Sequence, residues 1–87
     1  MKRLESSHGT IELTDERLDH ILMFHPEVRG HLKFFSETLA RPQSIVLSRR
    51  DHAVKIFYSG LRRKRRLAIV VKTNQRNFIL TAYLTSK

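Results

Sequence analysis

The sequence contains no cysteine, which excludes disulfide bonds and thiolate chemistry. This absence suits a cytoplasmic protein, because disulfides are rare in reducing compartments. No apolar run reaches the roughly 18 residues that a membrane-spanning helix needs. The residues that follow the first two cations are not apolar, so no secretory signal is predicted there. We therefore expect a cytoplasmic protein without a membrane partner.

Acidic residues are also scarce. Eight Asp and Glu stand against 17 Lys and Arg, which gives a formal net charge of +9. Five of the cations are consecutive: Arg62, Arg63, Lys64, Arg65 and Arg66. Such a chain attracts polyanions, and each phosphate that it contacts releases counterions. We expect RNA as the partner and these five cations as RNA-binding residues. The alternative is a solvated loop that only maintains solubility.

The chain has 87 residues, of which 40% are hydrophobic. This composition predicts a folded core, and this length leaves room for one domain. We place that domain at residues 10–87 and expect residues 1–9 to be a flexible lead.

The helical spacing of apolar residues predicts two helices in the first half of the chain. Thr14 is a suitable N-cap, and Leu18, Ile21 and Leu22 follow on one helical stripe. Pro26 ends this helix and is well placed to begin a second one, which extends to about residue 41.

The second half predicts strands at residues 44–48, 53–58, 67–73 and 77–83, separated by short turns. Connections this short favour antiparallel hairpins. The expected fold class is therefore α+β, with two N-terminal helices packed on one face of a four-stranded antiparallel meander sheet.

Side-chain alternation predicts a polar set on the other face of this sheet. In the last strand Thr81 and Tyr83 point to the same side, and the preceding strand adds Lys72 if the two form a hairpin. The same alternation assigns Lys55 and Phe57 to this open face. An ammonium group, a hydroxyl group and a phenol on a basic sheet indicate a site for an RNA phosphate.

Two segments of the chain resemble a known superfamily. The first reads His20-Ile21 and then His25-Pro26-Glu27, and the second reads Phe78-Ile79-Leu80-Thr81-Ala82-Tyr83. Together they resemble the phage- and mobile-element-associated nuclease-like domains of the barnase–EndoU–colicin–RelE (BECR) superfamily. The resemblance extends over residues 10–85 and implies a RelE-like or barnase-like fold.

This resemblance implies a toxin-like endoribonuclease that needs neither a metal ion nor a cofactor. In that chemistry a ribose 2′-hydroxyl attacks the adjacent phosphorus and leaves a 2′,3′-cyclic phosphate. The resemblance also implies a second partner, an acidic antitoxin or immunity protein, for which a basic surface is suitable.

Five residues form the expected catalytic set. His20 and His25 match the histidines of the superfamily pattern and would act as general acid or base. Lys72 would neutralise phosphate charge, Thr81 would hydrogen-bond a phosphate oxygen, and Tyr83 would stack on a base or donate a proton. The ordinary alternatives are a capping or core-edge role for His25 and solvated or partly buried positions for the strand residues.

A helix-borne histidine faces a geometric obstacle, because the helices are expected to pack on the opposite face from Lys72, Thr81 and Tyr83. It could join them only around an edge or an end of the sheet. Otherwise the active set is sheet-borne, as in RelE-type enzymes. Lys55 and Phe57 would then supply a cation and a stacking platform for RNA. The competing functions are a noncatalytic basic RNA-binding module, a decayed nuclease homologue and a basic adaptor for an acidic protein.

Overall fold

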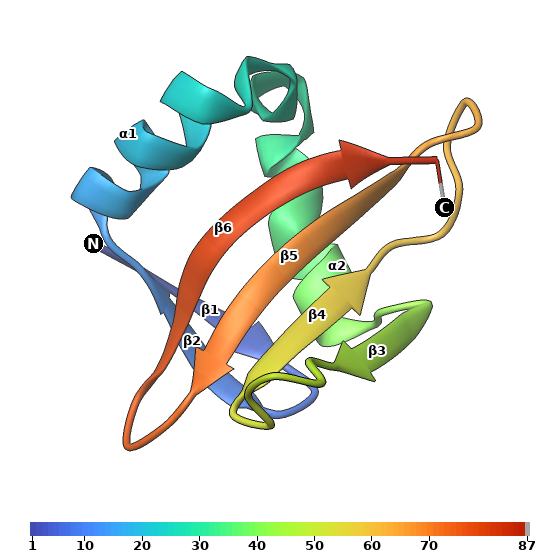
Figure 1. The fold of residues 1–87 in the computed structure, drawn as a ribbon. Helices are drawn as coiled ribbons and strands as arrows, with labels where there is room; N and C mark the ends of the chain where they lie inside the picture. Colours follow the sequence, from blue (N-terminus) through green and yellow to red (C-terminus); the bar gives the residue numbers. More distant parts are fainter. Residues whose placement is uncertain (87) are drawn as a thin grey trace.

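The computed structural model describes residues 1–86, in which six strands, two α-helices and one 3₁₀ segment (η1) are found. Figure 1 shows these elements, whose bounds are β1 Lys2–Ser6, β2 Gly9–Leu13, α1 Asp15–Phe24, η1 Pro26–Phe34, α2 Phe35–Ala40, β3 Ser44–Leu47, β4 Val54–Tyr58, β5 Arg66–Thr73 and β6 Asn77–Thr85. No helix in residues 1–86 is both long enough and apolar enough to cross a bilayer.

The strands of residues 1–86 form one mixed sheet in the order β1-β2-β6-β5-β4-β3. Four of the neighbouring pairs are antiparallel, and β2 is parallel to β6, with Glu12 opposite Phe78. The expectation of a four-stranded antiparallel meander preceded by two helices is therefore wrong. The expected strands from residue 44 onward exist, but an N-terminal hairpin adds two more and introduces the parallel pair.

This N-terminal hairpin, β1–β2, includes most of the segment that was expected to be a flexible lead. Leu4 lies opposite Ile11, and the Ser7 backbone N–H donates to the Leu39 carbonyl at 3.0 Å. Gly9 has a φ of +100°, a value that only glycine adopts without strain. Residues 5–10 are polar because they form the turn and the exposed side of the hairpin. Their sequence therefore gave no apolar pattern that would predict it.

The helical half differs from the expected pair of helices in its second element. Thr14 caps α1 and accepts the Arg17 backbone N–H at 3.1 Å. The helix stops at His25, and Pro26 then begins η1 rather than an α-helix. The expected second helix is thus divided into η1 and α2, and nine residues is long for a 3₁₀ segment.

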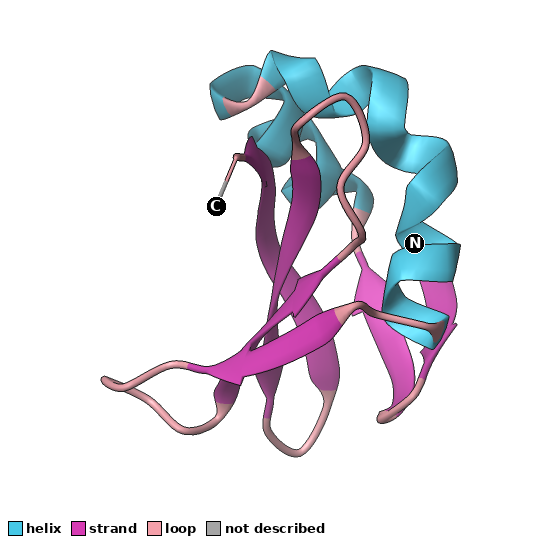
Figure 2. Ribbon diagram, turned by 90° about the vertical axis from the view of Figure 1, so that its right-hand side faces the viewer, coloured by secondary structure: helices cyan, strands magenta, loops and turns pink. Residues whose placement is uncertain are grey.

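The helices cover one face of the sheet, as the view in Figure 2 shows, and the core lies between these two layers. In that core α1 and η1 each contribute one fully buried residue, Ile21 and Val28. The remaining buried apolar side chains of the cluster are Ile11, Leu13, Phe35, Leu39, Phe57, Leu67, Ile69, Val71, Ile79 and Ala82. Leu67, Ile69 and Val71 alternate along β5, which fixes the side of this central strand that faces the helices.

A β-bulge in β6 changes which residues of this strand face the helices. Thr81 lies opposite Val70 and Ile79 lies opposite Val71, so Leu80 is an extra residue between them. Ile79 therefore points into the core, where its exposure is 1%. Alternation without a bulge, counted back from Tyr83 and Thr81, would instead place Ile79 on the open face.

Strand β4 is turned over relative to the prediction from its sequence. Phe57 lies opposite Ile69 and is completely buried, with the His8 ring packed edge-on at a centroid distance of 5.8 Å. An aromatic ring buries much apolar area, so packing selects Phe57 rather than its neighbour Tyr58 for the core side. Because Lys55 shares the side of Phe57, the prediction that both lie on the open face is wrong, and a base cannot stack on Phe57.

Candidate active site

Three of the expected catalytic residues lie on the open face of the sheet, opposite the helices. The register places Thr81 opposite Val70 and Tyr83 opposite Ala68. Lys72 follows two residues after Val70 and therefore points to the same side of β5. Thr81 and Tyr83 are both half-buried, so a ligand on this face would find them partly accessible.

His25 reaches this face around an edge of the sheet. Strand β2 pairs with β6 only at Glu12 and Phe78, so the carboxyl-terminal part of β6 borders α1 and η1 instead of a strand. His25 is the residue between these two helical elements. Its ring centroid lies 6.0 Å from that of Tyr83, with an interplanar angle of 41°. The structure thus brings one expected histidine and one expected tyrosine together.

A carboxylate lies on the other side of the His25 ring. His25 Nδ1 is 3.6 Å from Oε2 of Glu27, and the two side chains are 37% and 38% exposed. Pro26, between them, fixes the start of η1 and so holds both side chains at the same corner. A carboxylate beside one ring nitrogen orients the imidazole and leaves Nε2 for a substrate.

A second phenol flanks Tyr83. Tyr58 and Tyr83 lie on either side of Ala68 on the open face, and both are paired with it in the strand register. Burial raises the pKa of Tyr83 above its ordinary value, and the charge and hydrogen bonding of Tyr58 raise it further. The Tyr83 hydroxyl therefore stays protonated at neutral pH and is engaged in a hydrogen bond with Tyr58.

Arg66 adds a cation to this end of the open face. It is the first residue of β5 rather than a loop residue, and it lies opposite Thr85. Its position two residues before Ala68 places it on the same side as Tyr83. The Nε atom of Arg66 is buried and has no hydrogen-bond partner within residues 1–86.

Lys72 lies at the far end of the same face. Four strand positions separate it from Ala68, the residue opposite Tyr83, and this corresponds to roughly 13 Å at the usual strand rise. Its ammonium Nζ donates to Oδ2 of Asp51 at 3.0 Å. This bond and the Ala53 backbone N–H lower the pKa of Asp51. Lys72 is therefore not part of the His25–Tyr83 cluster.

His20 is also separate from the cluster. It lies exposed on α1, stacked against Phe24 at a ring-centroid distance of 4.7 Å. The pocket beside it is lined by two carboxylates, Glu16 and Asp19, and by Arg17. The structure places only one of the two expected histidines near the strand residues.

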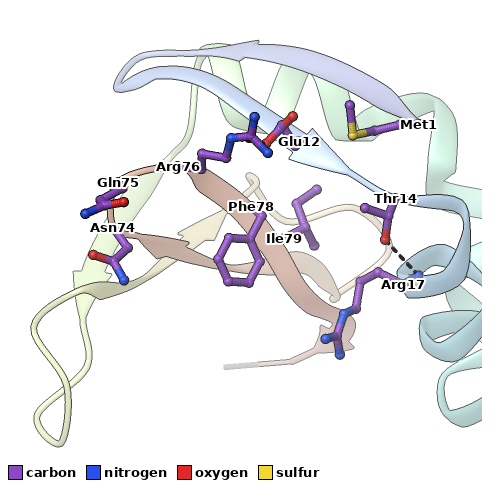
Figure 3. A pocket seen from close by; sticks show the side chains of 9 residues that line it. All are labelled: Met1, Glu12, Thr14, Arg17, Asn74, Gln75, Arg76, Phe78 and Ile79. Carbon is purple, nitrogen blue, oxygen red and sulfur yellow. Dashed lines mark hydrogen bonds and ion pairs between the residues drawn. The ribbon is translucent and has the colours of Figure 1, made fainter.

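Another pocket lies where β2 meets β6, and Figure 3 shows the side chains around it. Glu12 lines this pocket between two cations, 3.8 Å from Arg3 and 3.9 Å from Arg76. Phe78 lines it as well, and none of the expected catalytic residues does. No group of three or more His, Asp or Glu side chains in residues 1–86 is arranged to hold a metal ion.

Sequence reasoning missed three members of the cluster. Tyr58 and Glu27 were not among the expected site residues, and Arg66 was expected only as one of five consecutive cations that bind RNA. For Glu27 a signal was available, because it directly follows Pro26 after His25. For Tyr58 the signal depends on which side of β4 faces the core, and the sequence pattern predicted the wrong side. For Arg66 it depends on where β5 begins. Comparisons of the chain with models of protein families, with curated proteins and with solved structures found no match.

Proposed function

We propose that this protein is a small metal-independent endoribonuclease that cleaves single-stranded RNA by attack of the ribose 2′-hydroxyl. The observation that carries the proposal is the cluster of His25, Glu27, Tyr83 and Arg66 at one end of the open sheet face. It combines a group that exchanges protons near neutral pH, a protonated phenol and a permanent cation. The resemblance to the BECR superfamily supports the same chemistry.

Each member of the cluster has a role in this proposal. His25, oriented by Glu27, removes the proton of the 2′-hydroxyl, whose oxygen then forms a bond to phosphorus while the bond to the 5′-oxygen breaks. Tyr83 donates a proton to the departing 5′-oxygen, which becomes a 5′-hydroxyl, and the proton that His25 holds returns to the Tyr83 oxygen through solvent. Arg66 stabilises the negative charge that develops on the phosphate. Histidine acid–base catalysis typically contributes 10²–10⁴-fold, roughly, to the rate.

The remaining open-face residues would bind RNA rather than react with it. Thr81 lies between the cluster and Lys72, where its hydroxyl can contact the next phosphate. Lys72 lies further along the face, where Asp51 offsets its charge. The net charge of +9 supports attraction of the RNA backbone as a whole.

A biological setting for this activity follows from the resemblance alone. We propose a toxin-like role in the cytoplasm, with an acidic antitoxin or immunity protein as the natural inhibitor. A basic surface complements such a partner.

A noncatalytic RNA-binding module is the second candidate. The ion pair between Lys72 and Asp51 favours it over catalysis, because the cation expected to neutralise phosphate charge in the reaction is held by a carboxylate. Cleavage assays of the wild-type protein and of a His25 variant separate the two candidates. Purified protein should cleave single-stranded RNA in the presence of EDTA, and His25→Ala should abolish this cleavage.

His20→Ala is the matched control, since it removes a histidine outside the cluster and is purified in the same way. Full cleavage by His25→Ala, or equal losses in both variants, would contradict the proposed active site. RNA binding by the wild-type protein without any cleavage would establish the second candidate.

A further inference from the structure

The connection between β4 and β5 ends in a two-residue turn made of cations. The Arg62 N–H donates to the Arg65 carbonyl at 2.6 Å, and the Arg65 N–H donates to the Arg62 carbonyl at 3.0 Å. The central residues Arg63 and Lys64 both have positive φ, +52° and +68°. Positive φ at both positions defines the type I′ geometry, for which Asn-Gly is the preferred pair.

Arginine and lysine are unfavourable choices for this backbone. A side chain with a Cβ is strained in the left-handed region, whereas glycine is not. The side chains of Arg63 and Lys64 are exposed and make no ion pair with a carboxylate of residues 1–86. Neither side chain therefore gains an ion pair that would offset the strain, and strain of this kind is concentrated at functional sites.

The turn faces a groove formed with η1. Lys33 and Phe34 line one side of this groove, and Arg63 and Arg65 line the other. Arg62 lies over the Phe34 ring, with Cζ 4.1 Å from the centroid, and it also pairs with Glu37 at 3.6 Å. Arg62 and Lys33 thus both contact Phe34 of the helical layer, with Lys33 Nζ 5.3 Å from the ring centroid, while Arg63 and Arg65 are left for a ligand.

We infer that this turn and groove bind the phosphates of single-stranded RNA, an inference that rests on the proposed function and gives its substrate a second contact. Arg65 directly precedes Arg66, and Leu84 of the groove directly follows Tyr83. The groove therefore lies at the same end of β5 and β6 as the His25–Tyr83 cluster, but on the other face. An RNA strand that passes over this end reaches both.

The chemistry favours nucleic acid over an acidic protein as the ligand. The guanidinium group matches phosphate in a bidentate geometry, which a carboxylate-bearing protein surface offers less densely than an RNA backbone does. The two cationic turn residues can be removed without harm to the fold, because their replacement by Asn and Gly relieves the strain.

The test is the double variant Arg63→Asn with Lys64→Gly, measured with a 2′-O-methyl RNA that cannot be cleaved. We expect the melting temperature to rise by roughly 4–8 °C. We expect the affinity for RNA to fall at least about fivefold, and the slope of log K against log salt to become shallower by about 1.4 for two lost phosphate contacts. A turn with a purely structural role cannot give opposite changes in stability and affinity.

The matched control is Arg49→Asn with Arg50→Gly, which removes the same charge from the exposed β3–β4 connection. Equal losses of affinity in the two double variants would overturn the inference, and so would unchanged affinity in the first. An equal loss of binding to polyglutamate would overturn it in favour of an acidic protein ligand. Because the RNA is uncleavable, failure of the ribonuclease proposal appears separately, as the absence of wild-type cleavage of ordinary RNA.

Discussion

The rings of His25 and Tyr83 lie 6.0 Å apart although one belongs to the helical layer and the other to the open face of the sheet. The contact exists because β2 pairs with β6 at a single position and leaves the rest of that edge to α1 and η1. A helix-borne acid–base group and a sheet-borne phenol can therefore act on the same substrate. The incomplete pairing of β2 with β6 is the structural condition for the proposed site.

Glu27 is predicted to position His25 rather than to react. Glu27→Gln keeps the shape of the side chain but removes the charge that lies 3.6 Å from Nδ1. We expect kcat to fall about tenfold with little change in KM, since histidine orientation matters mainly in the transition state. An unchanged kcat would remove Glu27 from the site.

Tyr83 is predicted to ionise at a higher pH than an ordinary tyrosine. Burial and the neighbouring Tyr58 raise its pKa, so the folded value lies above the unfolded value of about 10. This contribution to stability is complete below about pH 10 and is lost as the pH rises through the folded pKa.

A spectrophotometric tyrosine titration measures this shift. Tyr58→Phe should lower the pKa of Tyr83 toward its ordinary value, because one of the causes is removed. Tyr83→Phe should leave the fold intact and reduce cleavage, since it deletes only the hydroxyl. Titration of both tyrosines at the ordinary value would show that they do not interact.

Asp51 and Lys72 contribute to stability with a pH dependence opposite to that of Tyr83. The hydrogen bond from Lys72, followed by that from the Ala53 N–H, lowers the pKa of Asp51. The contribution is therefore present above the unfolded pKa of about 4 and is lost as the pH falls through the folded value. Asp51→Asn should lower the melting temperature at pH 7, with the difference from wild type shrinking as the pH falls below about 4.

The same variant tests whether Lys72 is restrained by its partner. Without the carboxylate, Lys72 is free to contact phosphate, so Asp51→Asn should bind RNA about two- to fivefold more tightly at low salt. Arg50→Gln is a suitable comparison, because it alters the charge of the same connection in the other direction. Weaker RNA binding by Asp51→Asn would show that the ion pair supports binding instead of limiting it.

The N-terminal hairpin is predicted to be part of the cooperative core. Ile11 has 0% exposure, so Ile11→Ala should lower the free energy of unfolding by about 2–5 kcal/mol. Leu47→Ala, at an exposed edge-strand position, should cost no more than about 0.5 kcal/mol. Urea denaturation measures both values. Equal, small effects would mean that the hairpin is only loosely attached.

Local patterns in the sequence were sufficient where one short-range rule acts alone. Thr14 as the N-cap, the end of α1 before Pro26 and the positions of the last four strands all follow from such rules. The alternation of Thr81 and Tyr83 was also readable, because the bulge at Leu80 lies before them. Below that bulge the same alternation fails for Ile79.

Long-range packing decided the rest. Whether Phe57 or Tyr58 faces the core depends on how β4 packs against the helical layer. The sequence of β4 alone does not indicate this packing. The pairing of β2 with β6 joins segments far apart in the chain, and no local sequence pattern predicts it. Tyr58 and Arg66 join the cluster around Tyr83 because of the register of β4, β5 and β6. The sequence could therefore indicate part of the site but not all of its members.

The nature of the RNA ends tests the central claim most directly. Single-stranded RNA is incubated with the protein in EDTA, and the products are analysed by mass spectrometry, with a fully 2′-O-methylated strand of the same sequence in parallel. The proposed mechanism predicts 2′,3′-cyclic phosphate and 5′-hydroxyl ends from the ordinary strand, no cleavage of the methylated strand, and no products with His25→Ala. Cleavage of the methylated strand, or wild-type protein that binds RNA and leaves it whole, would contradict the account.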